Sequence, residues 1–469
     1  MNMKTILIVG GGFSGAVTAA RLLQGHPGPV RIVLANGSGR AARGMAYGTQ
    51  SPDHTLNVPA GNMSAFDDAP DHFLHFMRER VPGTDAGSFV SRKMYGDYLE
   101  WLVARAEGQA PAGATLERLY QHVTGIIPMG AYAMATLESG ATIRADKVVL
   151  ALGHFASADP YIADMDFYDS RRYLRDPWDA DKVGRIGPDE PVMLLGTGLT
   201  AIDMAITLLE RNPRRRITAV SRRGLLPQYH RHGAHPPASS QTAAAIWGEA
   251  ATVRDQLRAF RAYTRRLAAD GRDWREGMAL LRPVTAEVWR AYPARERQRF
   301  LRHVQPYWDT HRHRLAPSVA DRFDAALKAG VVRTMAARLR SLDECQGGVA
   351  AMVQPRGTGQ TVRIDAAWVI NCTGPCADPR RARHPLVNQL LDDGVIRTDS
   401  LGLGLELGKD GAVVGAGGQL SNLVYYIGPW LKAAHWEATA VPDLRRFASE
   451  LARTLANSAG DTAINQAID

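Results

Sequence analysis

Short apolar runs that each end in a glycine-rich turn organise this sequence. Residues 6–9 (ILIV) are continuously apolar, as expected of a strand that is buried on both faces. Gly10, Gly12 and Gly15 follow as G-x-G-x-x-G, and the helical pattern of residues 16–23 begins at once. The glycines allow a tight turn, close approach of a pyrophosphate, and close packing of helix on strand. This order therefore predicts a dinucleotide site, in which the helix N-terminus favours the phosphates.

The same succession of strand and turn begins again at residue 192. Residues 192–195 (VMLL) form an apolar run, and residues 196–201 (GTGLTA) form a turn in which alanine takes the third small position. The next strand, residues 216–220, leads into Arg222 and Arg223. Arginines at this place suit the 2′-phosphate of NADP, so the second site is expected to prefer NADP to NAD. The alternative is that both arginines lie in a solvated loop.

The strand after the first turn departs from the usual pattern. Residues 30–34 (VRIVL) predict this strand, whose end carries an Asp or Glu for the ribose hydroxyls in most dinucleotide-binding folds. Here Ala35 and Asn36 stand at that end. Asn36 can donate or accept one such hydrogen bond, but the carboxylate is missing, so the contacts of the adenosine ribose stay open.

Two longer stretches repeat a common layout. Residues 115–153 alternate like short strands and end in a buried strand at residues 147–153 (KVVLALG). Residues 331–374 follow the same order and end at residues 367–374 (AWVINCTG). This internal repeat fits two nucleotide-binding units, each with a three-stranded insert.

Residues 43–66 (RGMAYGTQSPDHTLNVPAGNMSAF) have no clear period, and they interleave aromatic, polar and turn-forming residues. Long structured loops in compact domains usually serve a function. We therefore expect this loop to take part in a binding site; the alternative is a surface excursion.

Residues 225–324 are rich in Arg, His, Trp and Ala, and most of them predict helices. His230, His232 and His235 form H-x-H-x-x-H, a spacing that invites a metal site. The prolines beside them and the missing carboxylates match no familiar metal site. We therefore expect no metal, and favour a loop over a nicotinamide or a substrate.

Composition and charge limit the protein class. The 469 residues suffice for two or three domains, and no apolar run approaches the length of a membrane span. The net charge is +9, but the arginines are spread along the chain, so nucleic-acid binding is not expected. Three cysteines make no disulfide framework, and Cys372 and Cys376 are expected to be ordinary cysteines rather than a redox pair. Without a secretory cleavage site, a cytoplasmic protein is expected.

Five segments together carry a resemblance to the flavoproteins that have two domains, one for FAD and one for NAD(P). They are GGGFSG, the loop of residues 43–66, GTGLTAID, SRRGLLP and IGPWLKAAHWEATAVP. More narrowly, the chain resembles a widespread bacterial group of that superfamily. The resemblance implies an FAD site formed by Gly10, Gly12, Phe13, Ser14, Gly15, Asn36, Tyr47, Leu56, Asn57, Val58, Val123, Gly153, Gly428 and Pro429. It implies an NADPH site formed by Gly196, Thr197, Gly198, Leu199, Thr200, Arg222 and Arg223.

Within that FAD site, Val123 would lie beside the adenine and Tyr47, Leu56, Asn57 and Val58 near the isoalloxazine, with Gly428 and Pro429 on its pyrimidine side. Residues 423–428 (LVYYIG) predict a strand and residues 430–440 a helix. The N-terminus of that helix would point its positive end at the flavin ring.

The expected fold is α/β, with two Rossmann-like dinucleotide-binding domains, for FAD and NADPH, and a helical insertion. Residues 1–185 would form the first part of the FAD-binding domain. Residues 186–345 would form the NADPH-binding domain, with its helical insert at about 225–325. Residues 346–469 would complete the FAD-binding domain.

More distantly, the chain is similar to N-hydroxylating and Baeyer–Villiger flavin monooxygenases. The similarity implies that NADPH reduces FAD, and that a C4a-(hydro)peroxyflavin formed with molecular oxygen then oxygenates a small substrate, such as the amine of an amino acid. The Arg and His content of the insert suits a carboxylate-bearing substrate. Asn57 and His230 are the candidate catalytic residues, each with a structural role as the alternative. Two other functions stay open: an NADPH-dependent reductase that serves a small acceptor, and a nucleotide-binding regulator without turnover.

Overall fold

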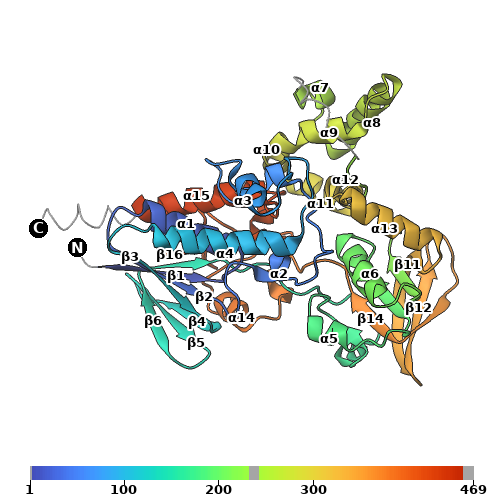
Figure 1. Ribbon diagram of the computed structural model, residues 1–469, viewed down its shortest axis with the longest axis horizontal. Coiled ribbons are helices and arrows are strands. Elements are labelled where there is room, and N and C mark those ends of the chain that lie inside the picture. Colours follow the sequence, from blue (N-terminus) through green and yellow to red (C-terminus); the bar gives the residue numbers. More distant parts are fainter. Residues whose placement is uncertain (1–2, 38, 232–241, 458–469) are drawn as a thin grey trace, which may run out of the picture. The chain divides into compact units, whose positions relative to one another are not determined.

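The computed structural model describes residues 3–37, 39–231 and 242–457. It divides into two compact units: unit 1 comprises residues 1–155 and 376–469, and unit 2 comprises residues 156–375. Each unit is built around a sheet of mainly parallel strands (Figure 1). Among the described residues, no helix has the length and apolar character needed to cross a membrane.

Unit 1 contains a six-stranded sheet in the order β15-β16-β7-β1-β2-β3, in which every neighbouring pair except β15–β16 is parallel. Its strands are β1 (Lys4–Val9), β2 (Val30–Ala35), β3 (Ala114–Leu119), β7 (Lys147–Leu150), β15 (Ala412–Val414) and β16 (Leu420–Tyr426). In the pairing of β1 with β7, Val9 lies opposite Leu150. The last four residues of β1 are buried, as its apolar run predicts. A parallel sheet in this order is the Rossmann arrangement.

Helices and a small second sheet cover the sheet of unit 1. α1 packs against both α4 and α15, and the three-stranded sheet β4-β5-β6 packs with α14 on β4 (Figure 1). The helices are α1 (Phe13–Gly25), α2 (Gly44–Tyr47), α3 (His72–Arg80), α4 (Arg92–Gly108), α14 (Pro385–Asp392) and α15 (Val441–Asn457). The small strands are β4 (Val123–Pro128), β5 (Ala133–Leu137) and β6 (Thr142–Ala145). Short 3₁₀ turns are η1 (Ala60–Asn62), η4 (Pro379–Arg381) and η5 (Pro429–Ala433).

Unit 2 contains a seven-stranded sheet in the order β13-β12-β11-β10-β9-β14-β8. β8, β14, β9, β10 and the first part of β11 are parallel, whereas the second part of β11 pairs antiparallel with β12, which pairs with β13. The strands are β8 (Tyr173–Leu174), β9 (Val192–Leu195), β10 (Ile217–Ser221), β11 (Val332–Cys345), β12 (Gly348–Pro355), β13 (Val362–Ala366) and β14 (Trp368–Asn371). This unit therefore repeats the parallel order of unit 1 and adds its own antiparallel strands.

The helices of unit 2 include a long helical insertion between β10 and β11. α6 follows β9 and contacts α13, the last helix of the insertion. The helices are α5 (Ala180–Gly184), α6 (Leu199–Arg211), α7 (Ala244–Trp247), α8 (Val253–Ala269), α9 (Trp274–Leu281), α10 (Thr285–Ala291), α11 (Ala294–His303), α12 (Gln305–Arg312) and α13 (Pro317–Lys328). Two 3₁₀ turns are η2 (Asp166–Asp169) and η3 (Arg282–Val284). The α/β fold with two Rossmann-like units and a helical insertion is thus confirmed.

The boundaries between the two units differ from the domain boundaries that the sequence suggests. The expected boundaries were 185/186 and 345/346, whereas the compact units divide at 155/156 and 375/376. The reason is strand pairing: β8 pairs with β14, and β12 and β13 extend from β11. These strands are therefore held in the sheet of unit 2, although they look like separate short segments in the sequence.

The prediction of a helix at residues 430–440 is wrong. Only η5 forms there, and the chain then continues in turns. The Trp430 ring is buried, with its centroid 4.7 Å from that of Phe155 and 5.9 Å from that of Tyr426. The apolar spacing of this segment thus reflects packing on several sides rather than one helical face.

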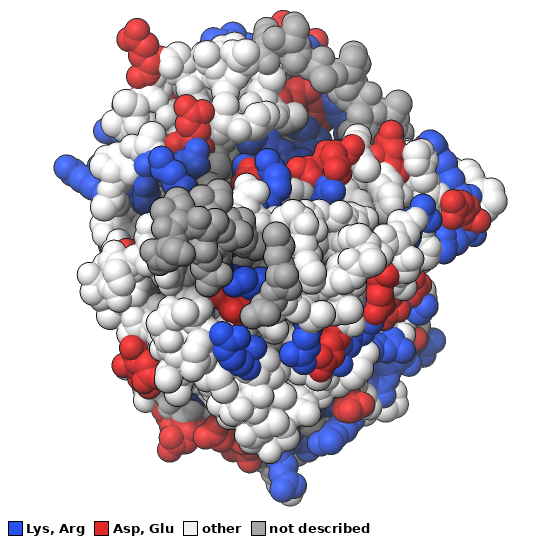
Figure 2. Space-filling view, turned by 90° about the vertical axis from the view of Figure 1, so that its left-hand side faces the viewer, with Lys and Arg blue, Asp and Glu red and all other residues white. Residues whose placement is uncertain are grey.

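Charge is mixed on the face of the molecule drawn in Figure 2. Lysine and arginine side chains lie there among aspartate and glutamate side chains. The net charge of +9 is therefore not gathered into one uniform basic area on this face.

Candidate dinucleotide-binding sites

The first glycine turn is packed against the end of β7. Gly10 has φ +112°, and a Cβ there would lie 2.4 Å from the carbonyl oxygen of Ala151. A Cβ on Gly15 would lie 1.9 Å from the carbonyl oxygen of Gly10. Both positions therefore require glycine, as the motif predicts.

The middle glycine of this turn serves a different purpose. At Gly12 the nearest atom to an added Cβ is the Cα of Gly44, at 3.5 Å, which is an ordinary van der Waals contact and not a clash. α1 starts at Phe13 without a side-chain cap, so Ser14 and Gly15 are also in its first turn. The first N–H groups of a helix have no carbonyl partner within the helix. The glycine backbone at this position and these N–H groups fit the pyrophosphate of a dinucleotide.

Asn36 lies against this turn. Its backbone amide donates to the carbonyl oxygen of Leu119 at 2.7 Å, and its side chain is buried. A Cβ on Gly11 would lie 3.2 Å from Asn36 Oδ1 and closer still to its carbon atoms. The residue expected at the ribose position is therefore beside the glycine turn, with an amide where a carboxylate is usual.

Gly428 comes to the same edge of the sheet. It has φ +147°, and a Cβ there would lie 2.8 Å from the carbonyl oxygen of Leu152, just after β7. Gly153 follows and is exposed, with no atom within 4 Å of an added Cβ. Pro429 starts η5, which is too short to act as the helix that the sequence suggested. Gly10, Gly153 and Gly428 are thus brought together at the carboxyl ends of β1, β7 and β16, where Rossmann-like folds bind ligands.

Val123 follows His122, which contacts the residue after Asn36. Val123 begins β4 and is 4% exposed. The adjacent His122 ring packs on Gly37, where an added Cβ would lie 2.3 Å from the ring. The expected adenine-side residue therefore follows a residue that contacts the segment after β2.

His154 is a candidate site residue that sequence reasoning missed. It follows Gly153, and burial, together with the positive charge of Lys432, lowers the pKa of its imidazole to about 4. His154 is therefore neutral at pH 7. A lone histidine after a buried strand gave no signal in the sequence beyond its place beside Gly153.

The loop of residues 43–66 is fastened at its start. Arg43 is 5% exposed; its Nε donates to Glu100 Oε1 at 2.6 Å, its Nη1 donates to the carbonyl oxygen of Lys93 at 3.2 Å, and it also pairs with Asp97. These partners raise the pKa of Arg43. Sequence reasoning missed this contact, for which the only signal was an arginine at the loop's start and acidic residues on a later helix. Because the next residue, Gly44, lies against Gly12, the loop begins beside the first glycine turn.

Tyr47 and Phe13 meet through Tyr95. The centroid of the Tyr95 ring lies 4.5 Å from that of Tyr47 and 6.4 Å from that of Phe13. Burial raises the pKa of Tyr47 to about 12, so its phenol is neutral at pH 7. Two residues expected at the FAD site, one from the loop and one from α1, thus share an aromatic cluster.

The middle of the loop lies along the segment before α4. The amide of Leu56 donates to the carbonyl oxygen of Val90 at 2.8 Å, and Leu56 is buried. Asn57 and Val58 follow and are half-buried. The candidate catalytic Asn57 is therefore held on a fixed stretch of backbone.

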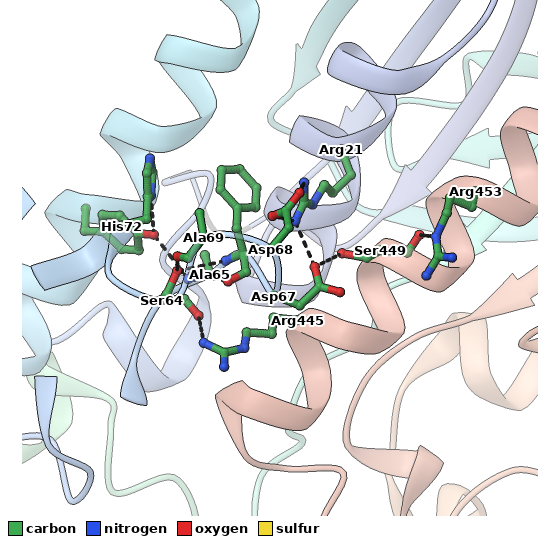
Figure 3. A network of polar contacts seen from close by, with 12 residues as sticks. Arg21, Ser64, Ala65, Asp67, Asp68, Ala69, His72, Arg445, Ser449 and Arg453 are labelled. Atoms are coloured by element: carbon green, nitrogen blue, oxygen red, sulfur yellow. Dashed lines mark hydrogen bonds and ion pairs between the residues drawn. The ribbon is translucent and has the colours of Figure 1, made fainter. Parts of the chain in front are cut away.

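Figure 3 shows that the chain beyond this loop is fastened as well. Arg21 of α1 donates to Asp67 Oδ1 at 2.8 Å and to Asp68 Oδ2 at 2.9 Å. From α15, Ser449 donates to Asp67 Oδ1 at 2.5 Å, and Arg445 donates to the carbonyl oxygen of Ser64 at 3.0 Å. The loop is therefore anchored to α4 at one end and to α1 and α15 at the other, which is the rigid support a binding loop needs.

The second glycine turn, in unit 2, has the same construction. Gly196 has φ +120°, and a Cβ there would lie 2.4 Å from the carbonyl oxygen of Cys372, which follows β14. No atom lies within 4 Å of an added Cβ on Gly198. Leu199 and Thr200 begin α6, which has no side-chain cap. A glycine that no side chain could replace, a second glycine at which an added Cβ would meet no clash, and an uncapped helix thus recur in the order found in unit 1.

Thr197 stabilises this turn through its hydroxyl. Its Oγ1 donates to the carbonyl oxygen of Leu225 at 2.6 Å and lies 2.8 Å from Ser221 Oγ. The side chain is buried. The hydroxyl of Thr197 is therefore bound to the end of β10 and to the segment that follows it. Only the backbone of Thr197 forms part of the glycine turn.

The two arginines after β10 differ. Arg222 is exposed, whereas Arg223 donates from Nη2 to the carbonyl oxygen of Arg302 on α11 at 3.0 Å. Arg222 is therefore the better candidate for a phosphate contact, and Arg223 connects the turn to the helical insertion.

The histidine motif is described in part. His230 is buried, and its amide donates to the carbonyl oxygen of Leu315 at 2.9 Å; His232 and His235 lie outside the described residues. The described residues contain no group of three side chains that could hold a metal. His230 belongs to unit 2, whereas the other candidate catalytic residue, Asn57, belongs to unit 1.

Cys372 and Cys376 are both buried thiols without a disulfide. Burial raises the pKa of each. A thiol with a raised pKa is a poor nucleophile at neutral pH.

Sequence comparison finds similarity over part of the chain. Residues 7–155 match the model of the FAD-NAD(P)-binding family. A segment of 142 residues is 32% identical to nitrosuccinic acid synthase of Aspergillus oryzae. This match covers 28% of the chain and 22% of that relative's length.

Structure comparison finds solved structures of similar fold over almost the whole chain. The ornithine N-hydroxylase of Kutzneria sp. 744, solved with reduced FAD, NADP⁺ and L-ornithine, matches with a TM-score of 0.68 and 14% identity over 98% of this chain and 100% of that one. The L-lysine 6-monooxygenase of Pseudomonas syringae matches with a TM-score of 0.63 and 14% identity over 100% of both chains. The chain therefore has the fold of the N-hydroxylating flavin monooxygenases, and its residues 7–155 match the model of the FAD-NAD(P)-binding family.

Proposed function

We propose that this chain is an FAD- and NADPH-dependent monooxygenase that N-oxygenates a small amine or amino acid. One observation carries the proposal: two glycine turns of matching construction, at Gly10 and Gly196, lie in a fold shared over nearly the whole chain with N-hydroxylating enzymes. Two such turns supply one site for FAD and one for NADPH, which is what this reaction class requires.

The residues of unit 1 would bind and position FAD. The backbone at Gly12 and the first turn of α1 would hold the pyrophosphate, and Asn36 would hydrogen-bond the adenosine ribose. Bound FAD would accept a hydride from NADPH and activate oxygen. The anchored loop would hold Asn57 in a fixed place, where the Asn57 amide is our candidate to hydrogen-bond flavin or substrate.

The residues of unit 2 would bind NADPH. Gly198 and the first residues of α6, Leu199 and Thr200, would face the pyrophosphate, and Arg222 would contact the 2′-phosphate. Charge-assisted bonds from a guanidinium to a phosphate are among the strong polar contacts in proteins. His230 is the candidate for contact with substrate or nicotinamide from this unit.

The substrate class is inferred from the chemistry that the relatives' names describe. Two named structures act on ornithine and lysine, and the curated relative is named for nitrosuccinic acid, whose nitro group is an oxidised amine between two carboxyl groups. We therefore propose an amine that also carries a carboxylate as the substrate of this chain.

The test is an oxygen-labelling experiment on the FAD-loaded protein. NADPH is added without oxygen, and reduction is followed by loss of flavin absorbance. Isotopically labelled oxygen is then admitted with L-aspartate, L-ornithine or L-lysine, and the products are analysed by mass spectrometry. We expect the label in an N-oxygenated product. Reduction with peroxide as the only oxygen product would overturn the proposal in favour of a reductase, and no reduction would favour a binding protein.

A further inference from the structure

The strand order of unit 2 reverses between β9 and β14. From β9 the chain proceeds outward to β10 and β11, and it later returns to β14 on the other side of β9. Rossmann-like sheets bind a dinucleotide at the carboxyl ends of their strands, across the place where the order reverses. Because Arg222 follows β10, the adenosine half of NADPH would lie on that side of the glycine turn. The nicotinamide half would then lie on the side of β14.

Thr373 stands just beyond the carboxyl end of β14. In the pairing of β14 with β9, Asn371 lies opposite Leu195, the last residue before the turn at Gly196. The amide of Cys372 donates to the carbonyl oxygen of Leu195 at 2.8 Å, and Gly196 packs on the carbonyl oxygen of Cys372. Thr373 follows and is exposed. It is therefore the first exposed residue beside the second glycine turn on the β14 side.

The hydroxyl of Thr373 already uses its hydrogen. Thr373 Oγ1 donates to Asn371 Oδ1 at 2.7 Å, and the Thr373 amide donates to the same oxygen at 3.1 Å. Asn371 Nδ2 donates to the carbonyl oxygen of Ala158 at 3.3 Å, so backbone groups on both sides fix which end of the side chain carries the oxygen. A hydroxyl has one hydrogen to donate and two lone pairs that accept. Thr373 can therefore offer a ligand an acceptor, but no donor.

A buried network holds Asn371 in this orientation. Asn371 is 0% exposed, and its Nδ2 also donates to the hydroxyl of Tyr173 on β8 at 2.8 Å. Tyr173 in turn donates to Asp159 Oδ1 at 2.7 Å, and Arg175 Nε donates to the same oxygen at 2.9 Å. Buried polar side chains that are hydrogen-bonded to one another fix each other's positions. The hydroxyl of Thr373 is thus held in place from within the unit.

We propose that Thr373 binds the nicotinamide half of NADPH, and that Asn371 and Tyr173 are its positioning residues. The carboxamide and the ribose hydroxyls of that half carry hydrogens that an acceptor can take. The phosphates of the cofactor offer acceptors themselves, so the hydroxyl of Thr373 does not suit them. This role rests on the proposed function, which assigns NADPH to unit 2, and it adds a contact that Arg222 and the glycine turn do not supply.

The experiment measures the affinity of the FAD-loaded full-length protein for three ligands by calorimetry. NADP⁺ and NAD⁺ share the nicotinamide half, whereas 2′,5′-ADP contains only the adenosine half with its 2′-phosphate. The oxidised cofactors are used so that the flavin is not reduced. We expect Thr373→Val to raise the Kd of NADP⁺ and of NAD⁺ about fivefold, because one hydrogen bond is lost, and to leave that of 2′,5′-ADP unchanged.

Three further variants serve as comparisons. Arg222→Ala should weaken the binding of NADP⁺ and 2′,5′-ADP but not of NAD⁺, and Thr373→Ser keeps the hydroxyl and should bind all three ligands like the wild type. The matched control is Thr124→Val on β4 of unit 1, which also removes an exposed threonine hydroxyl that donates within the chain. It should change none of the three affinities. In Thr373→Val the backbone amide still donates to Asn371, so the turn should stay folded, and urea unfolding checks this.

A double-variant cycle tests the positioning residues. Tyr173→Phe removes the hydroxyl that accepts from Asn371 and leaves Asp159 paired with Arg175. It should lower stability and raise the Kd of NADP⁺ by less than Thr373→Val does. Because Tyr173 acts through Thr373, the double variant should bind NADP⁺ as Thr373→Val alone does. Additive effects on the Kd would overturn the positioning role of Tyr173.

Failure of this inference and failure of the proposed function have different signatures. If Thr373→Val binds all three ligands like the wild type, or loses 2′,5′-ADP as strongly as NADP⁺, the contact with the nicotinamide half is overturned. NADP⁺ binding that depends on Thr373, in a protein that makes no N-oxygenated product, would keep the contact and discard the monooxygenase. A wild type that binds neither cofactor would overturn both.

Discussion

At the scale of single residues, the glycines of each nucleotide turn divide into two kinds. A side chain at Gly15 or Gly196 would overlap a backbone carbonyl oxygen, so these glycines are required for folding. Gly12 and Gly198 leave space into which no such oxygen projects. The second kind is the one through which cofactor binding can be tested without loss of the fold.

Gly198→Ala should therefore weaken NADPH binding in a folded protein. Gly198 has φ −83° and ψ −169°, which alanine adopts without strain, so the free energy of unfolding should change by less than about 0.5 kcal/mol. The added methyl would stand where the pyrophosphate approaches, and we expect the NADPH Kd to rise about tenfold or more, since about 1.4 kcal/mol is lost. Fluorescence titration and urea unfolding measure the two quantities.

The control is Gly359→Ala, a glycine in the loop before β13 that also has no atom within 4 Å of an added Cβ. It should leave both quantities unchanged. An unaltered NADPH Kd in a folded Gly198→Ala variant would remove Gly198 from the site.

His154 should make the stability of the protein depend on pH below neutrality. The unfolded chain protonates this imidazole near pH 6.5, whereas the folded protein does so only near pH 4. The unfolded state therefore binds the proton first as the pH falls, and the folded state loses up to about 1.4 kcal/mol per pH unit between these values. Above pH 6.5 this contribution is fully present.

The measurement is urea unfolding at pH 7 and pH 5. The loss of stability between the two should be smaller in His154→Gln than in the wild type by up to about 2 kcal/mol. His303→Gln, at an exposed position on α11, controls for the loss of an imidazole. Equal losses in the wild type and in His154→Gln would show that the native protein accepts this proton as readily as the unfolded chain.

At the scale of elements, strand β10 is followed by two arginines, and their replacement should affect different properties of the protein. Arg222→Ala should raise the KM for NADPH and leave that for NADH nearly unchanged, because a charge-assisted bond to a phosphate contributes roughly 1.5–3 kcal/mol. Arg223→Ala should lower stability instead, since Arg223 donates to the carbonyl oxygen of Arg302. Steady-state kinetics with both cofactors and thermal unfolding separate the two.

The double variant Arg222→Ala/Arg223→Ala should show both effects together. If Arg222→Ala changes the KM for NADPH and NADH alike, the preference for NADP at this site is excluded.

The elements that sequence could predict are those whose cause is local. The turns at Gly10 and Gly196 follow from a buried strand, fixed glycines and an immediate helix, and the structure has them as expected. The segment after Pro429 could not be predicted, because the Trp430 ring packs on Phe155 and Tyr426, far away in sequence, and these contacts replace a helix with a 3₁₀ turn.

The candidate site shows the same division. The glycines and Asn36 could be placed from spacing alone. Arg43 could not, because its partners Asp97 and Glu100 belong to a helix some fifty residues later, and nothing in the local pattern joins them. Thr197 was expected at the cofactor, yet its hydroxyl is bound to Leu225 and Ser221, a choice that only the fold of the following segment decides.

At the scale of the whole molecule, unit 2 is a single continuous segment with a complete sheet and a hydrophobic core of its own. A fragment of residues 156–375 should therefore fold alone and bind NADPH, but not FAD. Circular dichroism should show cooperative thermal unfolding, and nucleotide fluorescence should report NADPH binding. The same fragment with Gly198→Ala should unfold similarly and bind NADPH more weakly. A fragment without cooperative unfolding would contradict this prediction.

Unit 1 is discontinuous, and this has a consequence for its synthesis on the ribosome. One edge of β7 pairs with β1, and the other edge of β7 pairs with β16, which is synthesised after all of unit 2. At typical translation rates, about 270 residues between them correspond to roughly a quarter of a minute to a minute. During that delay the nascent chain carries an unpaired strand edge, which is prone to wrong pairing. Gly428 also arrives only then, so on the proposed function FAD would bind only in the last moments of translation, after unit 2 has had time to fold.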